Sequence, residues 1–333
     1  MHSDWGKVGY RLDWVGFPFG VSVKSRSVVA MSLYPDIAVV QESGSVVSAI
    51  ETSNGQNRWA AELTGPLTKW VGVVRESSDA GRLLVCSESE MFILAPGTGN
   101  ILGREPLSRV VNTSPVLVDS LAVFGTSTGV VQSHIIGRGL PSWGFASRGA
   151  IDADPVLVGA QIATVSQGGD VTFLSTSGEL VGRARVFGPL DNNPVTDGER
   201  LYIASRDQSV WCFDTAGNLV WRHRTPHPLS AQPALHDGVL YVDLGPGGLT
   251  AFDAVSGEVK WAAKDVHGTP IALRDRRLVV RDAAGLTVVD PARGDAIARI
   301  ELPGVARVMA DGFIDPNIYA ISDAGVLAKF MPR

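Results

Sequence analysis

Residues 247–261 read GGLTAFDAVSGEVKW, and this stretch decides the fold. Leu249 to Asp253 reads as a strand, and Ser256-Gly257 supplies a tight turn before a second strand that ends at Trp261. The same text recurs at residues 209–221 (SVWCFDTAGNLVW) and 45–59 (SVVSAIETSNGQNRW). The chain is therefore built from repeated β-hairpins.

Three separate markers give the repeat one period of about forty residues. A second series, of eight turns with one before each hairpin, runs from Gly44 to Gly325. A period near forty with four short strands is the size of a propeller blade. The hairpin glycines are Gly55, Gly99, Gly139, Gly178, Gly217, Gly257 and Gly294, and the prolines that precede the hairpins are Pro115, Pro155, Pro194, Pro233 and Pro270.

The last repeat lacks a strand, because the chain ends soon after the segment Val326 to Phe330. The segment Tyr10 to Trp14 has the apolar pattern of the missing fourth strand and ends in the same tryptophan. Pairing the two would remove exposed sheet edges. We therefore predict an all-β, eight-bladed β-propeller of four-stranded antiparallel blades, a single domain over residues 1–333. Residues 8–16 complete the blade formed by residues 305–333.

The composition excludes several classes of function. Hydrophobic residues make up 45% and charged residues 19%, and the net charge is −5, which argues against nucleic acid or an anionic surface as a bulk electrostatic partner. No apolar run approaches the roughly 20 residues of a spanning helix, so no transmembrane segment is predicted. The first residues lack a leader signature. The chain is expected in the cytoplasm, or in the periplasm or cell envelope if a leader has been removed.

No pattern indicates catalysis. Cys86 and Cys212 lie far apart in the sequence and form no disulfide framework, and no Gly-x-Ser-x-Gly elbow is present. The six histidines are scattered without the spacing of a metal site, and we interpret them as surface residues. The prediction is therefore no catalytic, cofactor-binding or metal-ligating residue, and no cofactor.

The pattern Ala251-x-Asp253-x-x-Ser256-Gly257-x-x-x-Trp261 resembles the tryptophan-docking motif of the pyrroloquinoline-quinone (PQQ) repeat family. In that family the tryptophan of one blade packs against the turn of its neighbour. Gly103, Gly182 and Ala298 stand at three of the corresponding positions, which predicts looser packing of blades two, four and seven. The resemblance implies a blade-docking role for Trp14, Trp59, Trp143, Trp221 and Trp261.

Two classes of protein carry this repeat, quinoprotein dehydrogenases and the BamB-like scaffolds of outer-membrane assembly. The dehydrogenases hold PQQ against adjacent cysteines with a metal ion bound by acidic side chains, and this chain has neither feature. The scaffold class, which forms eight-bladed propellers, is the better match. A PQQ-dependent or degenerate quinoprotein dehydrogenase is the alternative.

The resemblance extends to two loops. In BamB an LxLR-like stretch before one blade and an Asp-x-Asp before the next help to contact the barrel protein BamA. This chain has Leu107-Ser108-Arg109 before Pro115, and Asp152-Ala153-Asp154 before Pro155. The resemblance implies Leu107, Arg109, Asp152 and Asp154 as partner contacts. The expected function is a non-catalytic scaffold in a bacterial envelope assembly that binds proteins through inter-blade loops and reaches the membrane only through a partner.

Overall fold

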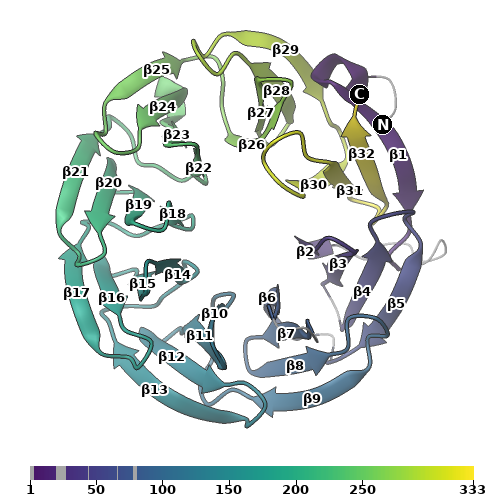
Figure 1. Ribbon diagram of the computed structural model, residues 1–333, viewed down its shortest axis with the longest axis vertical. Helices are drawn as coiled ribbons and strands as arrows, with labels where there is room; N and C mark the ends of the chain where they lie inside the picture. The colour runs from purple at the N-terminus through teal and green to yellow at the C-terminus, as the bar shows by residue number, and fades with distance from the viewer. Residues whose placement is uncertain (1–3, 20–27, 44, 66, 78–80) are drawn as a thin grey trace. The chain divides into compact units, whose positions relative to one another are not determined.

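The computed structural model describes residues 4–19, 28–43, 45–65, 67–77 and 81–333. It is an eight-bladed β-propeller in which each blade is a four-stranded antiparallel sheet (Figure 1), as the repeat predicts. Gly44, the first of the predicted turn series, lies outside the described residues. The chain divides into two compact units, one of residues 1–85, 92–103 and 270–333, the other of residues 86–91 and 104–269.

The first four blades follow the chain in order. Blade 1 holds β2 (Val28–Leu33), β3 (Ile37–Glu42), β4 (Val46–Glu51) and β5 (Asn57–Glu62). Blade 2 holds β6 (Trp70–Arg75), β7 (Leu83–Ser87), β8 (Glu90–Leu94) and β9 (Ile101–Pro106). Blade 3 holds β10 (Val116–Val118), β11 (Leu121–Gly125), β12 (Val130–Ile135) and β13 (Leu140–Ala146). Blade 4 holds β14 (Val156–Val158), β15 (Gln161–Val165), β16 (Asp170–Leu174) and β17 (Leu180–Arg185).

The remaining blades repeat this order until the last. Blade 5 holds β18 (Val195–Thr196), β19 (Arg200–Ser205), β20 (Ser209–Asp214) and β21 (Leu219–Arg224). Blade 6 holds β22 (Ala234–His236), β23 (Val239–Asp243), β24 (Leu249–Asp253) and β25 (Val259–Ala263). Blade 7 holds β26 (Thr269–Arg274), β27 (Arg277–Arg281), β28 (Gly285–Val289) and β29 (Ala296–Glu301). Blade 8 holds β30 (Val305–Ala310), β31 (Ile318–Ser322), β32 (Leu327–Pro332) and β1 (Tyr10–Gly16).

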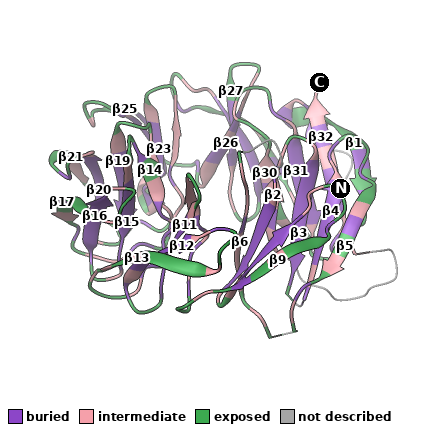
Figure 2. Cartoon of the chain, turned by 60° about the horizontal axis from the view of Figure 1, so that its bottom comes forward, coloured by how far each residue is buried: buried purple, intermediate pink, exposed green. Residues whose placement is uncertain are grey.

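The core lies in the second and third strands of each blade. Strands such as β3, β7 and β16 are buried at every position, whereas the fourth strands β9 and β13 carry long exposed stretches (Figure 2). A strand covered on both faces needs apolar side chains on both. This explains why the second and third strands read as continuous apolar runs, while the fourth strands mix apolar and charged residues.

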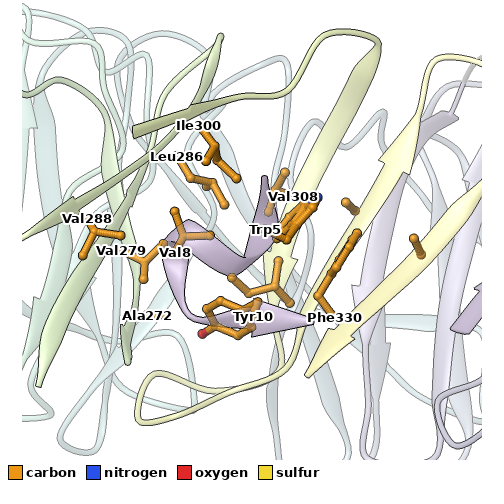
Figure 3. Close-up of a cluster of buried hydrophobic side chains, with 13 residues drawn as sticks. Trp5, Val8, Tyr10, Ala272, Val279, Leu286, Val288, Ile300, Val308 and Phe330 are labelled. Carbon is orange, nitrogen blue, oxygen red and sulfur yellow. The ribbon is translucent and has the colours of Figure 1, made fainter. Parts of the chain in front are cut away.

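The N-terminal segment completes blade 8. β1 pairs antiparallel with β32, from Tyr10 opposite Pro332 to Gly16 opposite Leu327, which confirms the predicted strand exchange. The contribution begins earlier than predicted, because the short 3-10 helix η1 (Trp5–Val8) precedes the strand. Trp5 stacks on Phe330 with ring centroids 3.6 Å apart, within a buried cluster that spans β1, β28, β29 and β32 (Figure 3).

Tryptophans from four fourth strands each cover a hairpin glycine of a neighbouring blade. A Cβ added to any of these glycines would lie 2.5–2.6 Å from the indole ring, so only glycine fits there. Each indole N–H also donates to a backbone oxygen of the same turn at 2.9–3.0 Å. The pairs are Trp14 on Gly55, Trp59 on Gly99, Trp143 on Gly178 and Trp221 on Gly257. The fifth docking residue, Trp261, is buried and lies beside Tyr241 of its own blade.

Replacement of Trp59 tests how much this contact contributes. Trp59→Ala should lower the free energy of unfolding by about 3–5 kcal/mol, because it empties a buried aromatic site. Trp59→Phe keeps most of the apolar contact but loses the hydrogen bond to Pro96 O. It should therefore lower the free energy of unfolding much less than Trp59→Ala does, with about 1 kcal/mol of the loss due to the missing hydrogen bond. Urea denaturation of the two variants measures the difference. Equal losses would show that the indole ring is not what holds the turn.

One prediction about the docking positions is wrong. Gly182 stands where other blades have tryptophan, and loose packing was expected there. In the structure its backbone instead packs directly against the neighbouring blade. A Cβ on Gly182 would lie 2.1 Å from Ala216 O in the β20–β21 turn, so the backbones of blades 4 and 5 touch directly. At Gly103 the nearest atom to such a Cβ is Ile93 Cδ1 of the same blade, at 3.3 Å.

Candidate partner-binding site

The residues directly before the five marker prolines form a polar seam that runs from blade 3 to Thr269, the first residue of β26. Asp154 N donates to Asn193 Oδ1 at 2.8 Å, and Asn193 N donates to Gln232 Oε1 at 2.9 Å. Thr269 Oγ1 donates to Gln232 O at 2.7 Å, and Ser114 N donates to Asp154 Oδ1 at 2.8 Å. Each bond joins residues 37 to 40 positions apart, so each links one blade to the next. The seam gives these loops a rigid base.

Asp154, one of the predicted partner contacts, is engaged within this seam. Its Oδ1 accepts from Ser114 N, and its Oδ2 accepts from Asn193 Nδ2 at 2.8 Å. Burial raises the pKa of the Asp154 carboxyl, while the two hydrogen bonds from Ser114 and Asn193 oppose that rise. Asp154 therefore holds three consecutive blades together at this edge.

Asp152 lies at the rim of an open polar pocket of about 400 Å³. Its side chain is exposed and accepts a hydrogen bond from Asn112 Nδ2 at 2.6 Å. Asp191, a second carboxylate on the pocket, is 3.5 Å from Arg206 Nη1. The rest of the lining is amide-rich and consists chiefly of Gln167, Asn192, Asn193 and Gln232. Such a lining suits a cationic or hydrogen-bonding side chain of a partner.

The other predicted loop is anchored at its two ends and exposed between them. Leu107 N donates to Ser89 O at 2.8 Å, and Val111 N donates to Glu88 O at 2.9 Å. Arg109 and Val110 between these anchors are exposed. The structure brings this loop and the Asp152 loop together through the Asn112–Asp152 hydrogen bond.

Sequence reasoning missed the amide residues of the seam and one buried histidine. Asn193 and Gln232 each directly precede a marker proline, and that shared position was the signal available for them, whereas Asn112 stands three positions before Pro115. His134 is fully buried and its Nε2 lies 2.8 Å from Glu105 Oε2, so its interpretation as a surface histidine is wrong. It lies in β12, a third strand, and third strands are the ones that the core covers on both faces.

The two cysteine thiols are inaccessible. Cys86 and Cys212 are both buried, and burial raises the pKa of both thiols, that of Cys212 to about 12. Both sulfurs are therefore protonated thiols at neutral pH. Within residues 4–333, outside the gaps given above, no group of three or more His, Cys, Asp or Glu side chains is placed to hold a metal ion. The same residues contain no helix long and apolar enough to cross a membrane.

Comparison with known proteins identifies relatives over nearly the whole chain. The family model described as outer membrane protein assembly factor BamB matches residues 45–191, 93–264 and 167–330. The crystal structure of BamB from Moraxella catarrhalis is 19% identical, covers 94% of this chain and 98% of its own, and superimposes with a TM-score of 0.74. The computationally designed protein Ika8 is 12% identical, covers 95% and 99%, and has a TM-score of 0.75. Comparison with curated protein sequences finds no match.

Proposed function

We propose that this chain, which belongs to the outer membrane protein assembly factor BamB family, is a non-catalytic scaffold of the bacterial cell envelope. It binds a protein of the outer-membrane assembly machinery through the loops that precede the first strands of blades 3 and 4. Leu107, Arg109 and Asp152 contact that partner, and Asp154 holds the contact surface in shape. The chain acts outside the cytoplasm and reaches the membrane through its partner.

The observation that carries the proposal is the direct link between the two loops. Asn112, three residues after Arg109, donates to Asp152, so a cationic and an anionic side chain are presented from one supported surface. Arg109 has no ion-pair partner among the described residues, and Asp152 borders the polar pocket. Exposed charges held by a stiff base are typical of loops that give a partner its orientation and specificity.

Charge reversal of the two exposed residues tests the proposal. We expect Arg109→Glu combined with Asp152→Lys to reduce recovery of the envelope partner on the order of tenfold. The reversed side chains would then face partner groups of the same charge. The readout is the amount of outer-membrane assembly protein that co-purifies after crosslinking in the native cell. The melting temperature should change little, because neither side chain is buried and the Asn112–Asp152 hydrogen bond that the variant loses is exposed to solvent.

Two further variants separate contact from structure. Arg138→Glu changes an exposed charge in the β12–β13 turn of the same blade and should leave partner recovery intact. Asp154→Ala should lower the melting temperature, because it leaves Ser114 N and Asn193 Nδ2 without their acceptor. Full partner recovery by the doubly reversed variant would refute the proposed contact.

A further inference from the structure

Two successive fourth strands carry the same sequence pattern. β17 reads LVGRAR (residues 180–185) and β21 reads LVWRHR (residues 219–224), so both follow Leu-Val-x-Arg-x-Arg. The aliphatic pair at the start of each strand is largely exposed, with exposed fractions of 44–53%. Paired aliphatic side chains left in solvent at corresponding places on two neighbouring blades indicate a surface for contact.

The two strands form one continuous surface. Gly182 of β17 touches the Ala216 turn that leads into β21, and Figure 1 shows β17 and β21 as the fourth strands of successive blades. Phe187, which follows β17, is 71% exposed, and its ring centroid lies 5.9 Å from that of Trp211. The Arg222 guanidinium sits over Trp211 at 3.9 Å and over Phe187 at 5.5 Å. We call this surface, formed by residues 180–187 and 219–224, the arginine edge.

The arginines of this edge differ from those of the other fourth strands in what surrounds them. In β9, Arg104 pairs with Glu90 at 2.8 Å, and in β29, Arg299 pairs with Asp282 at 2.7 Å. No carboxylate in the described part of the chain forms an ion pair with Arg185 or Arg224. Arg183 differs from them, because its guanidinium lies over the Phe145 ring at 5.9 Å and its charge helps to lower the pKa of the Asp170 carboxyl. The protein carries a net charge of −5, so Arg185 and Arg224, one on each of two neighbouring fourth strands, are opposite to its general charge. Exposed arginines without an ion-pair partner favour an anionic partner.

The backbone indicates what form that partner takes. The sheet orders end at β17 and at β21, so in the described residues each strand has hydrogen-bonding groups along one side with no paired strand. A lipid headgroup cannot satisfy a row of backbone N–H and C=O groups, whereas an extended peptide can pair with all of them. We propose that the arginine edge binds an extended acidic segment of a partner protein, which adds as a further strand with carboxylates on the arginines and apolar residues on the aliphatic pairs.

This surface is separate from the loops before the first strands, so either proposal can fail without the other. The probe is a short capped peptide of alternating glutamate and valine, labelled for fluorescence anisotropy. It should bind the full chain with an affinity that falls as salt rises. Hydrogen exchange should show protection of residues 180–185 or 219–224 in the complex. A lysine–valine peptide of the same length should not bind.

The decisive variant is Arg185→Glu combined with Arg224→Glu, which should weaken peptide binding by at least about tenfold. Arg277→Glu with Arg293→Glu makes the same change in net charge on exposed sites of blade 7 and should leave the affinity within about twofold. If the glutamate variant proves unstable, Arg185→Gln with Arg224→Gln gives the same comparison with a smaller effect. Unchanged affinity in the edge variants, or protection outside the two strands, would overturn the proposal. Binding to phosphatidylglycerol vesicles but not to the peptide would overturn it too, in favour of a membrane surface.

Discussion

A chain that begins at residue 17 will lose its single cooperative thermal transition. The deleted segment contributes Trp5, Val8, Tyr10 and Trp14 to the core, each no more than 8% exposed. Removal of one large buried side chain costs about 2–5 kcal/mol, and a whole domain is typically stable by only about 5–15 kcal/mol. The deletion also uncovers the edge of β32 along six paired positions, from Pro332 to Leu327. The loss therefore exceeds what a typical domain can tolerate.

Calorimetry of the truncated chain measures this effect, and two controls define its cause. Arg11→Ala changes an exposed residue of β1 and should alter stability by no more than about 0.5 kcal/mol. A synthetic peptide of residues 1–19, added in trans, should restore part of the transition because it can reoccupy the edge of β32. A truncated chain that melts as cooperatively as the full one would show that the strand exchange does not stabilise the propeller.

Among glycine-to-alanine substitutions in the fourth strands, Gly182→Ala is expected to lower the free energy of unfolding most. The new Cβ would lie 2.1 Å from Ala216 O and 2.4 Å from Ala216 C, and both belong to backbone that cannot rotate away. Blades 4 and 5 must then separate, which we expect to cost about 3 kcal/mol. Chemical denaturation measures the loss.

Gly103→Ala is the matched control, since Gly103 occupies the corresponding position of blade 2. Its added Cβ meets only the flexible end of Ile93 at 3.3 Å, and alanine restricts the unfolded chain more than glycine does. Its stability should therefore stay within about 1 kcal/mol of the original. Similar losses in the two variants would mean that strand propensity, and not the contact with Ala216, sets the requirement for glycine.

The matched pair also shows where sequence reasoning reached its limit. Tryptophan four residues after a hairpin glycine is a local pattern, and it picks out Trp59, Trp143 and Trp221. The family resemblance implied that each tryptophan packs on a neighbouring turn, and in the structure these three cover Gly99, Gly178 and Gly257. A glycine in place of tryptophan can leave an open space or allow a direct backbone contact. Gly103 and Gly182 have no side chain that would tell these two outcomes apart in the sequence.

The same limit applies to the candidate site. Arg109 and Asp152 were predicted from a resemblance in two loops, and the structure places both on exposed, supported backbone. Asp154 has an identical side chain to Asp152 two positions away, yet its oxygens are bound by Ser114 and Asn193. Both bonds reach residues 39 or 40 positions distant, so no local pattern separates the two aspartates.

The eight blades, their order and the N-terminal strand that completes the last could all be predicted from the sequence, because turn glycines, strand patterns and a period of about forty residues are local features. Which arginines lack an ion-pair partner could be learned only from the folded chain. Arg104 and Arg299 find carboxylates in their own sheets, whereas Arg185 and Arg224 do not. That difference depends on the register of strands and on contacts between blades, which bring together side chains that a repeat places one period apart.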